Sequence, residues 1–206
     1  MARYLDVHPQ DPQPRLLAQT VEMLRGGALI AYPTDSGYAL GAALGNKSAI
    51  DRIRAIRQLD AKHHFTLVCH DFAQLGRFVI VDNAVFRLVK AVTPGPYTFI
   101  LRATKEVPRM MLHPKKLTVG ARIPDHRLAQ ALLAELGAPL LSTTLILPGQ
   151  EQPMTEGWLV KDELDHAVDV VIEGEAGTAG PTTVVDLTTG APEVVRVGAG
   201  APDRFR

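Results

Sequence analysis

Side chains that could carry chemistry gather first in one short loop of this 206-residue sequence. Thr34, Asp35 and Ser36 supply two hydroxyls and a carboxylate. Pro33, which fixes the backbone φ angle, and Gly37, which tolerates unusual conformations, flank them. An apolar run ends just before the loop, and polar groups at the end of a buried strand are well placed to bind a ligand in an open α/β sheet. In the alternative interpretation, the loop is a turn whose side chains bond to local backbone amides.

Two arginines on one side of a predicted helix over residues 47–58 form a second candidate site. At about 100° per residue, Arg54 and Arg57 lie on the side of the apolar residues, whereas Arg52 points away. A guanidinium group is suited to forked recognition of phosphate or carboxylate, so both arginines could stand at the edge of a cleft. Alternatively, their apolar stems are buried and their charged heads reach water, and the residues alone leave both interpretations open.

Three more segments place polar side chains where predicted strands begin or end. Each segment is weak evidence alone, but together they indicate a ligand site beside the sheet. They are 119–124 with Arg122, 140–144 with Ser142, Thr143 and Thr144, and 181–186 with Thr182 and Thr183.

Periodicity predicts the elements that must position these side chains. Helical patterns alternate with strands to about residue 145, and strands cluster after that. This order predicts an α/β (α+β) fold: a single domain over 1–206, with its core at about 15–200, built on one twisted mixed β-sheet with flanking helices. The predicted strands cover 28–32, 38–43, 65–69, 97–102, 117–122, 139–143, 168–172, 182–187 and 193–197. A first helix is predicted after Pro14 and is ended by Gly26 and Gly27, and the other predicted helices cover 47–58, 71–77, 82–92, 126–136 and 156–165.

Charge is unevenly distributed, although the formal net charge is zero. Residues 1–130 carry 18 lysines and arginines and 10 acidic residues, whereas residues 131–206 carry 4 and 12. This asymmetry favours an anionic ligand, either a nucleotide or a nucleic acid, near the first part of the chain. The alternative is two solvated surfaces of opposite sign. The basic residues include Arg52, Arg54, Arg57 and Lys62 in one group and Arg102, Lys105, Arg109, Lys115, Lys116, Arg122 and Arg127 in another.

Composition excludes several classes of site and protein. Cys69 is the single cysteine, so the sequence excludes an internal disulfide and a cysteine-based zinc site. No apolar run approaches the roughly 20 residues that span a bilayer. Charged residues occupy the first turns of the chain, where a signal peptide needs an apolar core. We therefore expect a cytoplasmic protein with no membrane partner.

The standard templates for phosphate binding and hydrolysis are absent. The sequence contains no P-loop, no G-x-G-x-x-G after a strand, no G-x-S-x-G elbow and no H-E-x-x-H motif. His63 and His64 are adjacent, so on regular structure they would diverge rather than bind one metal, and we interpret them as loop histidines. A nucleotide site in this chain must be built in another way.

Six segments, in order, resemble the YrdC/YciO family over nearly the whole chain. They are YPTDSGYALG at 32–41, TPGPYTFIL at 93–101, VGARIPDH at 119–126, LLSTT at 140–144, PTTVVDL at 181–187 and VVRVG at 194–198. The segment IRQLDAKHHFTL at 56–67 is more similar to the YciO branch of the family than to the YrdC branch.

The resemblance implies a fold, an activity and a set of ligands. The family fold is one twisted mixed sheet with helices and a concave, positively charged cleft. Its better-known members condense threonine, bicarbonate (or carbon dioxide) and ATP into threonylcarbamoyl-AMP for tRNA modification, and members are also described as binding double-stranded RNA. We therefore expect ATP or AMP and a threonine-like molecule as ligands, with tRNA or double-stranded RNA as further candidates. Mg²⁺ is expected with ATP, held largely by phosphate oxygens and water, and no metal is expected to be bound by the protein.

By position, the resemblance also implies roles for nine residues. Thr34, Asp35 and Tyr38 would border the threonine and carbamoyl end of the pocket, whereas Arg57 and Thr144 would be catalytic. The residues expected to hold the nucleotide are Arg122, Ser142, Thr182 and Arg196.

The chain departs from the synthases of the family at two positions. Their K-x-R and S-x-N pairs keep only their first members here, as Arg57 and Thr144. Leu59 replaces the second cation, and Ile146 replaces the amide. Because loss of one preorganised donor lowers a rate by roughly 10²–10³, the two replacements predict reduced or altered synthase activity unless a neighbouring cation substitutes.

Two functions other than threonylcarbamoyl-AMP synthesis stay open. The chain could be a non-catalytic protein that binds double-stranded RNA or ribosomes through its basic face. Aromatic residues make up only 5% of the sequence, so recognition of duplex shape would then be favoured over base stacking. The chain could also bind a small molecule outside the usual set of the family.

Overall fold

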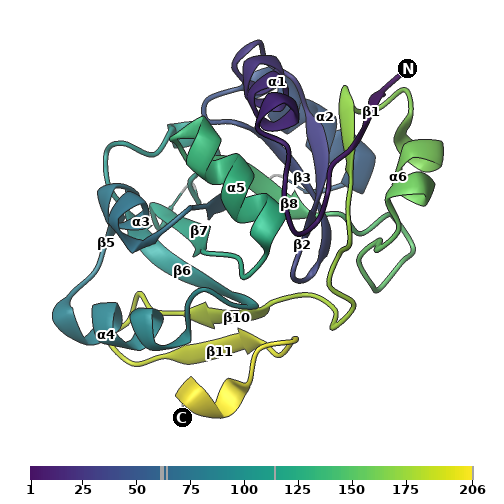
Figure 1. Ribbon diagram of the computed structural model, residues 1–206. Helices are drawn as coiled ribbons and strands as arrows, with labels where there is room; N and C mark the ends of the chain where they lie inside the picture. Colours follow the sequence, from purple (N-terminus) through teal and green to yellow (C-terminus); the bar gives the residue numbers. More distant parts are fainter. Residues whose placement is uncertain (61–62, 64, 114, 206) are drawn as a thin grey trace.

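One mixed β-sheet forms the centre of the computed structural model, which describes residues 1–60, 63, 65–113 and 115–205 (Figure 1). The sheet contains parallel and antiparallel pairs, so the predicted mixed sheet with flanking helices is confirmed. In spatial order the strands are β1 (Arg3–Asp6), β9 (Val170–Glu173), β2 (Ile30–Thr34), β3 (Gly37–Ala43), β8 (Leu140–Thr144), β4 (Thr66–Val68), β7 (Thr118–Arg122), β6 (Tyr97–Ala103), β10 (Thr183–Asp186) and β11 (Glu193–Arg196), with β5 (Val79–Ile80) paired to β6.

The helices lie close to the ranges that periodicity predicts. Among the strands, β1 and β5 are not predicted from the sequence. They have four and two residues and pair with β9 and β6. The sequence of β1 (RYLD) has charged residues at both ends and β5 has only two residues, so partners distant in sequence fix them. The helices are α1 (Pro14–Arg25), α2 (Lys47–Arg57), α3 (Phe72–Phe78), α4 (Asn83–Val92), α5 (Arg127–Leu136) and α6 (Gly157–Leu164), with 3₁₀ helices η1 (Arg109–Met111) and η2 (Pro202–Phe205).

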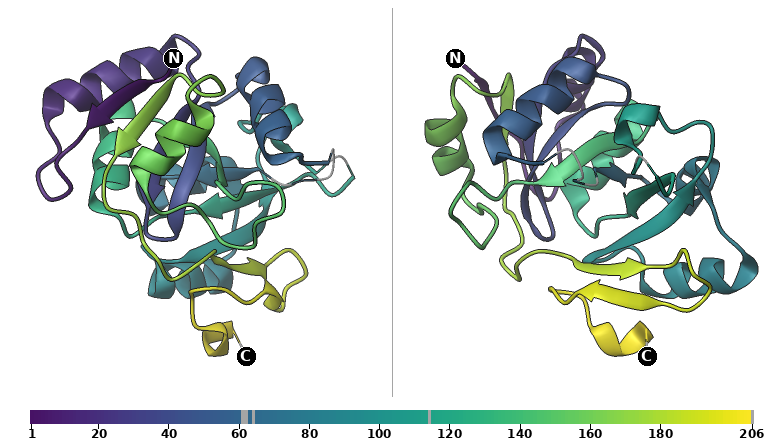
Figure 2. Two further views of the ribbon diagram at one scale, coloured as in Figure 1. Left: turned by 90° about the vertical axis from the view of Figure 1, so that its right-hand side faces the viewer. Right: turned by 180° about the vertical axis from the view of Figure 1, so that it is seen from behind.

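Strands β2 and β3 are covered by helices on both faces. Leu40 belongs to the same apolar cluster as Ile53 of α2, whereas Ala39, which points to the opposite face, joins the cluster of α1 and α5. Figure 2 shows α1 and α2 on opposite sides of these strands. Nearly every residue of β2 and β3 is therefore buried.

Strand β6 has one buried face and one open face. Tyr97, Phe99 and Leu101 are buried, and the rings of Tyr97 and Phe99 pack against Phe205 of η2. The alternate residues, Thr98, Ile100 and Arg102, are half-buried or exposed. This open face of β6, with its neighbours on β7 and β10, provides one wall of the candidate site.

Candidate functional site

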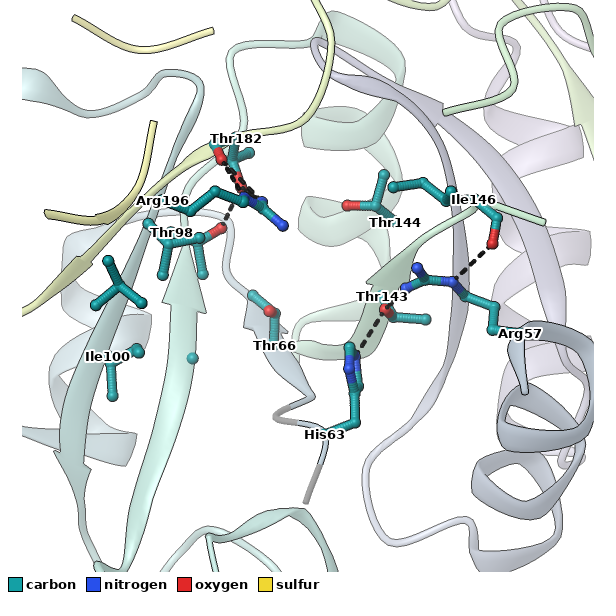
Figure 3. A pocket seen from close by; sticks show the side chains of 13 residues that line it. Arg57, His63, Thr66, Thr98, Ile100, Thr143, Thr144, Ile146, Thr182 and Arg196 are labelled. Carbon is teal, nitrogen blue, oxygen red and sulfur yellow. Dashed lines mark hydrogen bonds between the residues drawn. The ribbon is translucent and has the colours of Figure 1, made fainter. Parts of the chain in front are cut away.

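A pocket of about 330 Å³ lies between the open face of β6 and the carboxyl ends of α2 and β8 (Figure 3). Its wall combines cations, hydroxyls and aliphatic side chains from segments far apart in the sequence. The lining residues are Arg57, His63, Thr66, Thr98, Ile100, Gly120, Thr143, Thr144, Ile146, Thr182, Val184, Val195 and Arg196.

Arg57 reaches the pocket from the last turn of α2. The helix begins at the N-cap Asn46 and ends at Gln58, whose left-handed conformation (φ 51°) turns the chain away. The guanidinium group donates through Nε to the carbonyl of Ile146 (3.1 Å) and through Nη1 to Oγ1 of Thr143 (2.7 Å). Its other terminal nitrogen has no hydrogen-bond partner among the described residues, so it is available to a ligand.

Arg196 approaches from β11 on the opposite side of the pocket. Its Nε and Nη2 donate to the carbonyl of Thr182 (3.1 and 2.8 Å), and Nη2 also reaches the hydroxyl of Thr182 (3.2 Å). That hydroxyl bonds to the hydroxyl of Thr98 (2.8 Å). In the part of the chain that the structure describes, Nη1 of Arg196 has no partner. Figure 3 shows the guanidinium groups of Arg57 and Arg196 facing each other across the cavity.

Burial destabilises the charge of both arginines. Burial lowers the pKa of Arg57 to about 10, and the charge of Arg196 adds to this effect. Burial also lowers the pKa of Arg196. The lining residues include no carboxylate, and every hydrogen bond found for these guanidinium groups goes to a neutral oxygen. An anionic ligand between them would supply the missing countercharge.

His63 is a pocket residue that sequence reasoning missed. Its Nε2 lies 3.2 Å from Oγ1 of Thr143, the same oxygen that accepts from Arg57, and its ring packs edge-on against Phe65. His63 lies in a loop, as interpreted from the sequence, but α2 and β8 bring Arg57 and Thr143 to it, so it also lines the pocket. Spacing alone held no signal for this arrangement. His64 and Lys62 lie outside the described residues.

Gly120 of β7 forms part of the pocket floor. Pairing places it beside Ile100 of β6 and Thr66 of β4, on the open face. A Cβ atom here would lie 2.9 Å from Oγ1 of Thr66 and 3.2 Å from the carbonyl oxygen of Phe65. Any larger residue would crowd the strand and reduce the cavity.

Arg122, Asp35 and Thr34 lie outside the residues that line this pocket. Arg122 is almost fully buried and forms an ion pair with Asp35, while its Nη1 donates to the hydroxyl of Ser36 (2.7 Å). Burial lowers the pKa of Arg122, and the carboxylate of Asp35 opposes that shift. The hydroxyl of Thr34 donates to the carbonyl of Gly37 (2.7 Å), as expected for a turn.

Tyr38 and Ser142 are also absent from the residues that line the pocket. Tyr38 is fully buried, and its hydroxyl donates to the carbonyl of Ile172 (3.0 Å). Ser142 donates to the carbonyl of Leu40 (2.8 Å) and bonds to the hydroxyl of Tyr32 (3.0 Å). The pocket thus brings together four of the nine sequence-predicted residues, and the roles assigned to all nine stay predictions. Those four are Arg57, Thr144, Thr182 and Arg196.

The other two arginines of α2 serve packing and pairing. The guanidinium carbon of Arg54 lies 5.6 Å from the centre of the Phe65 ring, and Arg54 is not among the residues that line the pocket. Arg52 forms an ion pair with Asp169 (2.7 Å). Arg57, one turn after Arg54, is the arginine that lines the cavity.

The two positions that depart from the synthase pattern differ in the structure. Leu59 is half-buried and packs against the main apolar cluster. Ile146 lines the pocket with its side chain, and its carbonyl accepts from Arg57. Ile146 therefore changes the surface that a ligand meets, whereas Leu59 contributes to the packing beneath it.

Within residues 1–60, 63, 65–113 and 115–205, no group of three or more His, Cys, Asp or Glu side chains could hold a metal ion. Over the same residues, none of the helices combines the length and apolarity needed to cross a bilayer.

Comparison with known proteins identifies one family. A family model described as Sua5/YciO/YrdC, telomere recombination, matches residues 22–198. The chain is 50% identical over 200 residues to the uncharacterised protein YciO of Escherichia coli strain K12, covering 97% of both chains. The crystal structure of E. coli YciO matches with a TM-score of 0.96 and covers 100% of both chains.

The chain is also similar to a threonylcarbamoyl-AMP synthase and to a Sua5 protein. Threonylcarbamoyl-AMP synthase of Vibrio vulnificus strain YJ016 is 34% identical over 164 residues, which cover 78% of this chain and 87% of that enzyme. A variant of P. abyssi Sua5 matches with a TM-score of 0.87 at 26% identity, covering 96% of this chain and 60% of that one. The chain belongs to the Sua5/YciO/YrdC family, as the six sequence segments predict.

Proposed function

We propose that this member of the family binds ATP or AMP, with the phosphate groups held between Arg57 and Arg196. The observation that carries the proposal is the pair of guanidinium groups facing each other across the pocket, each with one terminal nitrogen available. The hydroxyls of Thr98, Thr144 and Thr182 line the same cavity and can donate to phosphate oxygens.

We further propose a carbamoyl-adenylate reaction at this site. The amine of threonine adds to carbon dioxide and gives a carbamate, one oxygen of which attacks the α-phosphorus of ATP. The bond from that phosphorus to the bridging oxygen breaks, and pyrophosphate leaves with the electron pair. Arg57 and Arg196 would offset the charge on the departing pyrophosphate. The 34% identity to a threonylcarbamoyl-AMP synthase supports this choice of substrates.

Magnesium would enter as part of the nucleotide. The residues that line the pocket offer hydroxyls and cations but no carboxylate, so they do not form a Mg²⁺ site by themselves. Phosphate oxygens and water would complete the coordination of the ion. The protein's contribution is then to hold the phosphates in place.

We expect the reaction to be slower than in the synthases. Ile146 places an aliphatic side chain where the synthase pattern has an amide, so one donor is missing from the wall that Arg57 and Thr144 share. A missing preorganised donor lowers the rate by roughly 10²–10³. Leu59 removes a second cation from the same region.

Binding is tested by titrating ATP and AMP into the purified protein. Arg57→Met and Arg196→Met should each raise the Kd for ATP at least 10-fold, because each removes one of the two cations that face each other across the pocket. The matched control is Arg25→Met, which removes an exposed arginine of α1. Equal ATP affinity in all four proteins would refute the phosphate site.

Activity is tested with threonine, bicarbonate and ATP, with detection of pyrophosphate and of the adenylate by mass spectrometry. Ile146→Asn should raise any turnover, since it restores the missing amide at the pocket surface. Leu59→Arg is less informative alone, because Leu59 packs against the apolar core. Absence of the adenylate in both the wild type and a folded Ile146→Asn variant would exclude synthase activity. The proposal of nucleotide binding is tested separately, by the titration.

Binding of double-stranded RNA is a second candidate function. Its specific support is a run of exposed cations in and beside the segment between β6 and β7, of which Lys105, Arg109 and Lys116 form no ion pair within the described residues. An affinity that falls steeply with salt would support duplex binding, because each neutralised phosphate releases counterions. An RNA affinity that is undetectable at low salt would reject it.

A further inference from the structure

A second hollow of about 480 Å³ lies on the open face of β6, one step along the strand from the pocket. Ile80 of β5, Arg102 of β6 and Thr118 of β7 are paired neighbours across three strands, so their side chains share this face. The adjacent row, formed by Ile100 and Gly120, belongs to the first pocket. The remaining lining residues of the hollow are Ala103, Lys116, Leu117, Thr188 and Thr189.

Two cations of this hollow lack a countercharge. Arg102 donates only to the carbonyl of Thr188 (3.3 Å), and Lys116 is exposed, with no ion pair found for either among the described residues. Within the described ranges, Asp82, which shares an adjoining hollow with Arg102, and Asp186 form no ion pair with either cation and accept hydrogen bonds from other groups. Asp82 caps α4, and Asp186 accepts from the backbone and hydroxyl of Thr188. The wall of the hollow itself includes no carboxylate.

Thr118 supplies an independent sign of a ligand. The residue is only 2% exposed, and its Oγ1 is buried without a hydrogen-bond partner in the part of the chain that the structure describes. Buried hydroxyls in native proteins are nearly always bonded, because leaving one unpaired is costly. The side chain of Thr118 lines the hollow, so rotation of its hydroxyl group toward Arg102 would let it donate to an oxygen of a ligand seated there.

The rim of the hollow is apolar. Ile80 is 61% exposed and Leu117 is 58% exposed, although both are large aliphatic residues. Leu117 also adopts a left-handed backbone conformation (φ 52°), which costs free energy for a leucine. The hollow thus offers cations and a buried hydroxyl inside and hydrocarbon at its edge.

We propose that this hollow is a second ligand site, for a small organic anion with an apolar group. The phosphate or carboxylate is held by Arg102 and Lys116 and accepts from the hydroxyl of Thr118. The apolar part packs against Ile80 and Leu117. The site is distinct from the nucleotide pocket and does not depend on the nucleotide proposal.

The first experiment titrates phenyl phosphate and benzoate into the wild-type protein and three variants, by calorimetry and by amide chemical shifts. Arg102→Met and Lys116→Met should each raise the Kd of the tighter probe at least 5-fold. The matched control is Arg87→Met, an exposed arginine of α4 that hydrogen-bonds within its own helix, and it should change nothing. Shifted amides should map to β5, β6 and β7.

The second experiment uses Thr118→Val, which keeps the shape of the side chain and removes the hydroxyl. This variant should melt at a higher temperature without ligand, because it removes an unpaired buried polar group, and it should bind the probe less tightly. A hydroxyl with a purely structural role would not alter probe affinity. A folded Thr118→Val protein with wild-type affinity would therefore overturn the role of Thr118.

Two further outcomes refute the site as a whole. One is the absence of saturable binding by either probe. The other is binding that persists in Arg102→Met and Lys116→Met but is lost in Arg57→Met, which would place the probe in the nucleotide pocket. Loss of ATP binding in Arg57→Met, with probe binding retained, would separate the two sites.

Discussion

The two halves of the sheet differ in how many of their faces are covered. In β2 and β3, helices pack on both sides, and almost every residue is buried. In β6, only alternate residues are buried, and the others point toward the two hollows. The sequence of each strand reflects this difference, since β3 is largely continuous apolar residues whereas β6 interrupts its apolar residues with Thr98 and Arg102.

This difference separates stability from binding. The covered half contributes the buried area that holds the fold together. The open half leaves cations and hydroxyls on a rigid strand, where they can meet a ligand without rearrangement. Arginines follow the same division: Arg122 is sealed in an ion pair with Asp35, while Arg57 and Arg196 face the cavity.

The largest expected effect comes from breaking the sealed pair. Asp35→Asn should lower the free energy of unfolding by about 3–5 kcal/mol, because it leaves the buried charge of Arg122 uncompensated. Urea denaturation measures this change. Arg57→Met, the matched loss of a charge at the open pocket, should change the stability by about 1 kcal/mol or less. Equal effects of the two variants would show that the arginines do not differ in this way.

The next effect compares one aliphatic residue from each half. Leu40→Ala should cost about 2–5 kcal/mol, because Leu40 is fully buried between layers and its removal leaves a cavity. Ile100→Ala should cost less, since the side chain of Ile100 lines an open pocket rather than the core. Both values come from the same denaturation experiment. A larger loss for Ile100→Ala would contradict the assignment of the open face.

The smallest effect concerns the buried side of the open half. Burial raises the pKa of the Cys69 thiol to about 12, with a smaller contribution from the charge of Asp71. At pH 8 the folded protein therefore carries roughly 10³-fold less thiolate than an unfolded chain with a thiol pKa of about 8.5. Reaction of native Cys69 with a disulfide reagent should be correspondingly slow.

The same pKa shift fixes the direction of the stability change with pH. The folded pKa lies above the unfolded value, so the contribution of Cys69 to stability is complete below about pH 8.5 and is lost progressively as the pH rises toward 12. Thr66→Cys in a Cys69→Ser background is the matched control, since Thr66 lines the open pocket and its replacement should react quickly. Equal labelling rates for the two proteins would contradict the burial of Cys69.

The sequence by itself determined the helices, the longer strands and the family. Alternation and helical periodicity are local properties, so they survive without knowledge of the tertiary contacts. Four residues that the family resemblance singled out, Arg57, Thr144, Thr182 and Arg196, line one cavity, and their roles stay predictions. Strands β1 and β5 could not be found in this way, because β1 has a charged residue at each end and no apolar run, and β5 has only two residues.

Only the tertiary structure decided which polar groups are available to a ligand. Arg122 and Arg57 both lie beside the sheet. Arg122 is paired with Asp35, which comes from a turn 87 residues away in the sequence, whereas Arg57 lines the cavity. His63 becomes a pocket residue because Thr143, 80 residues further along the chain, lies beside it. Charge pairing and burial depend on contacts between residues that are far apart in the sequence, and the spacing of residues along the chain does not predict such contacts.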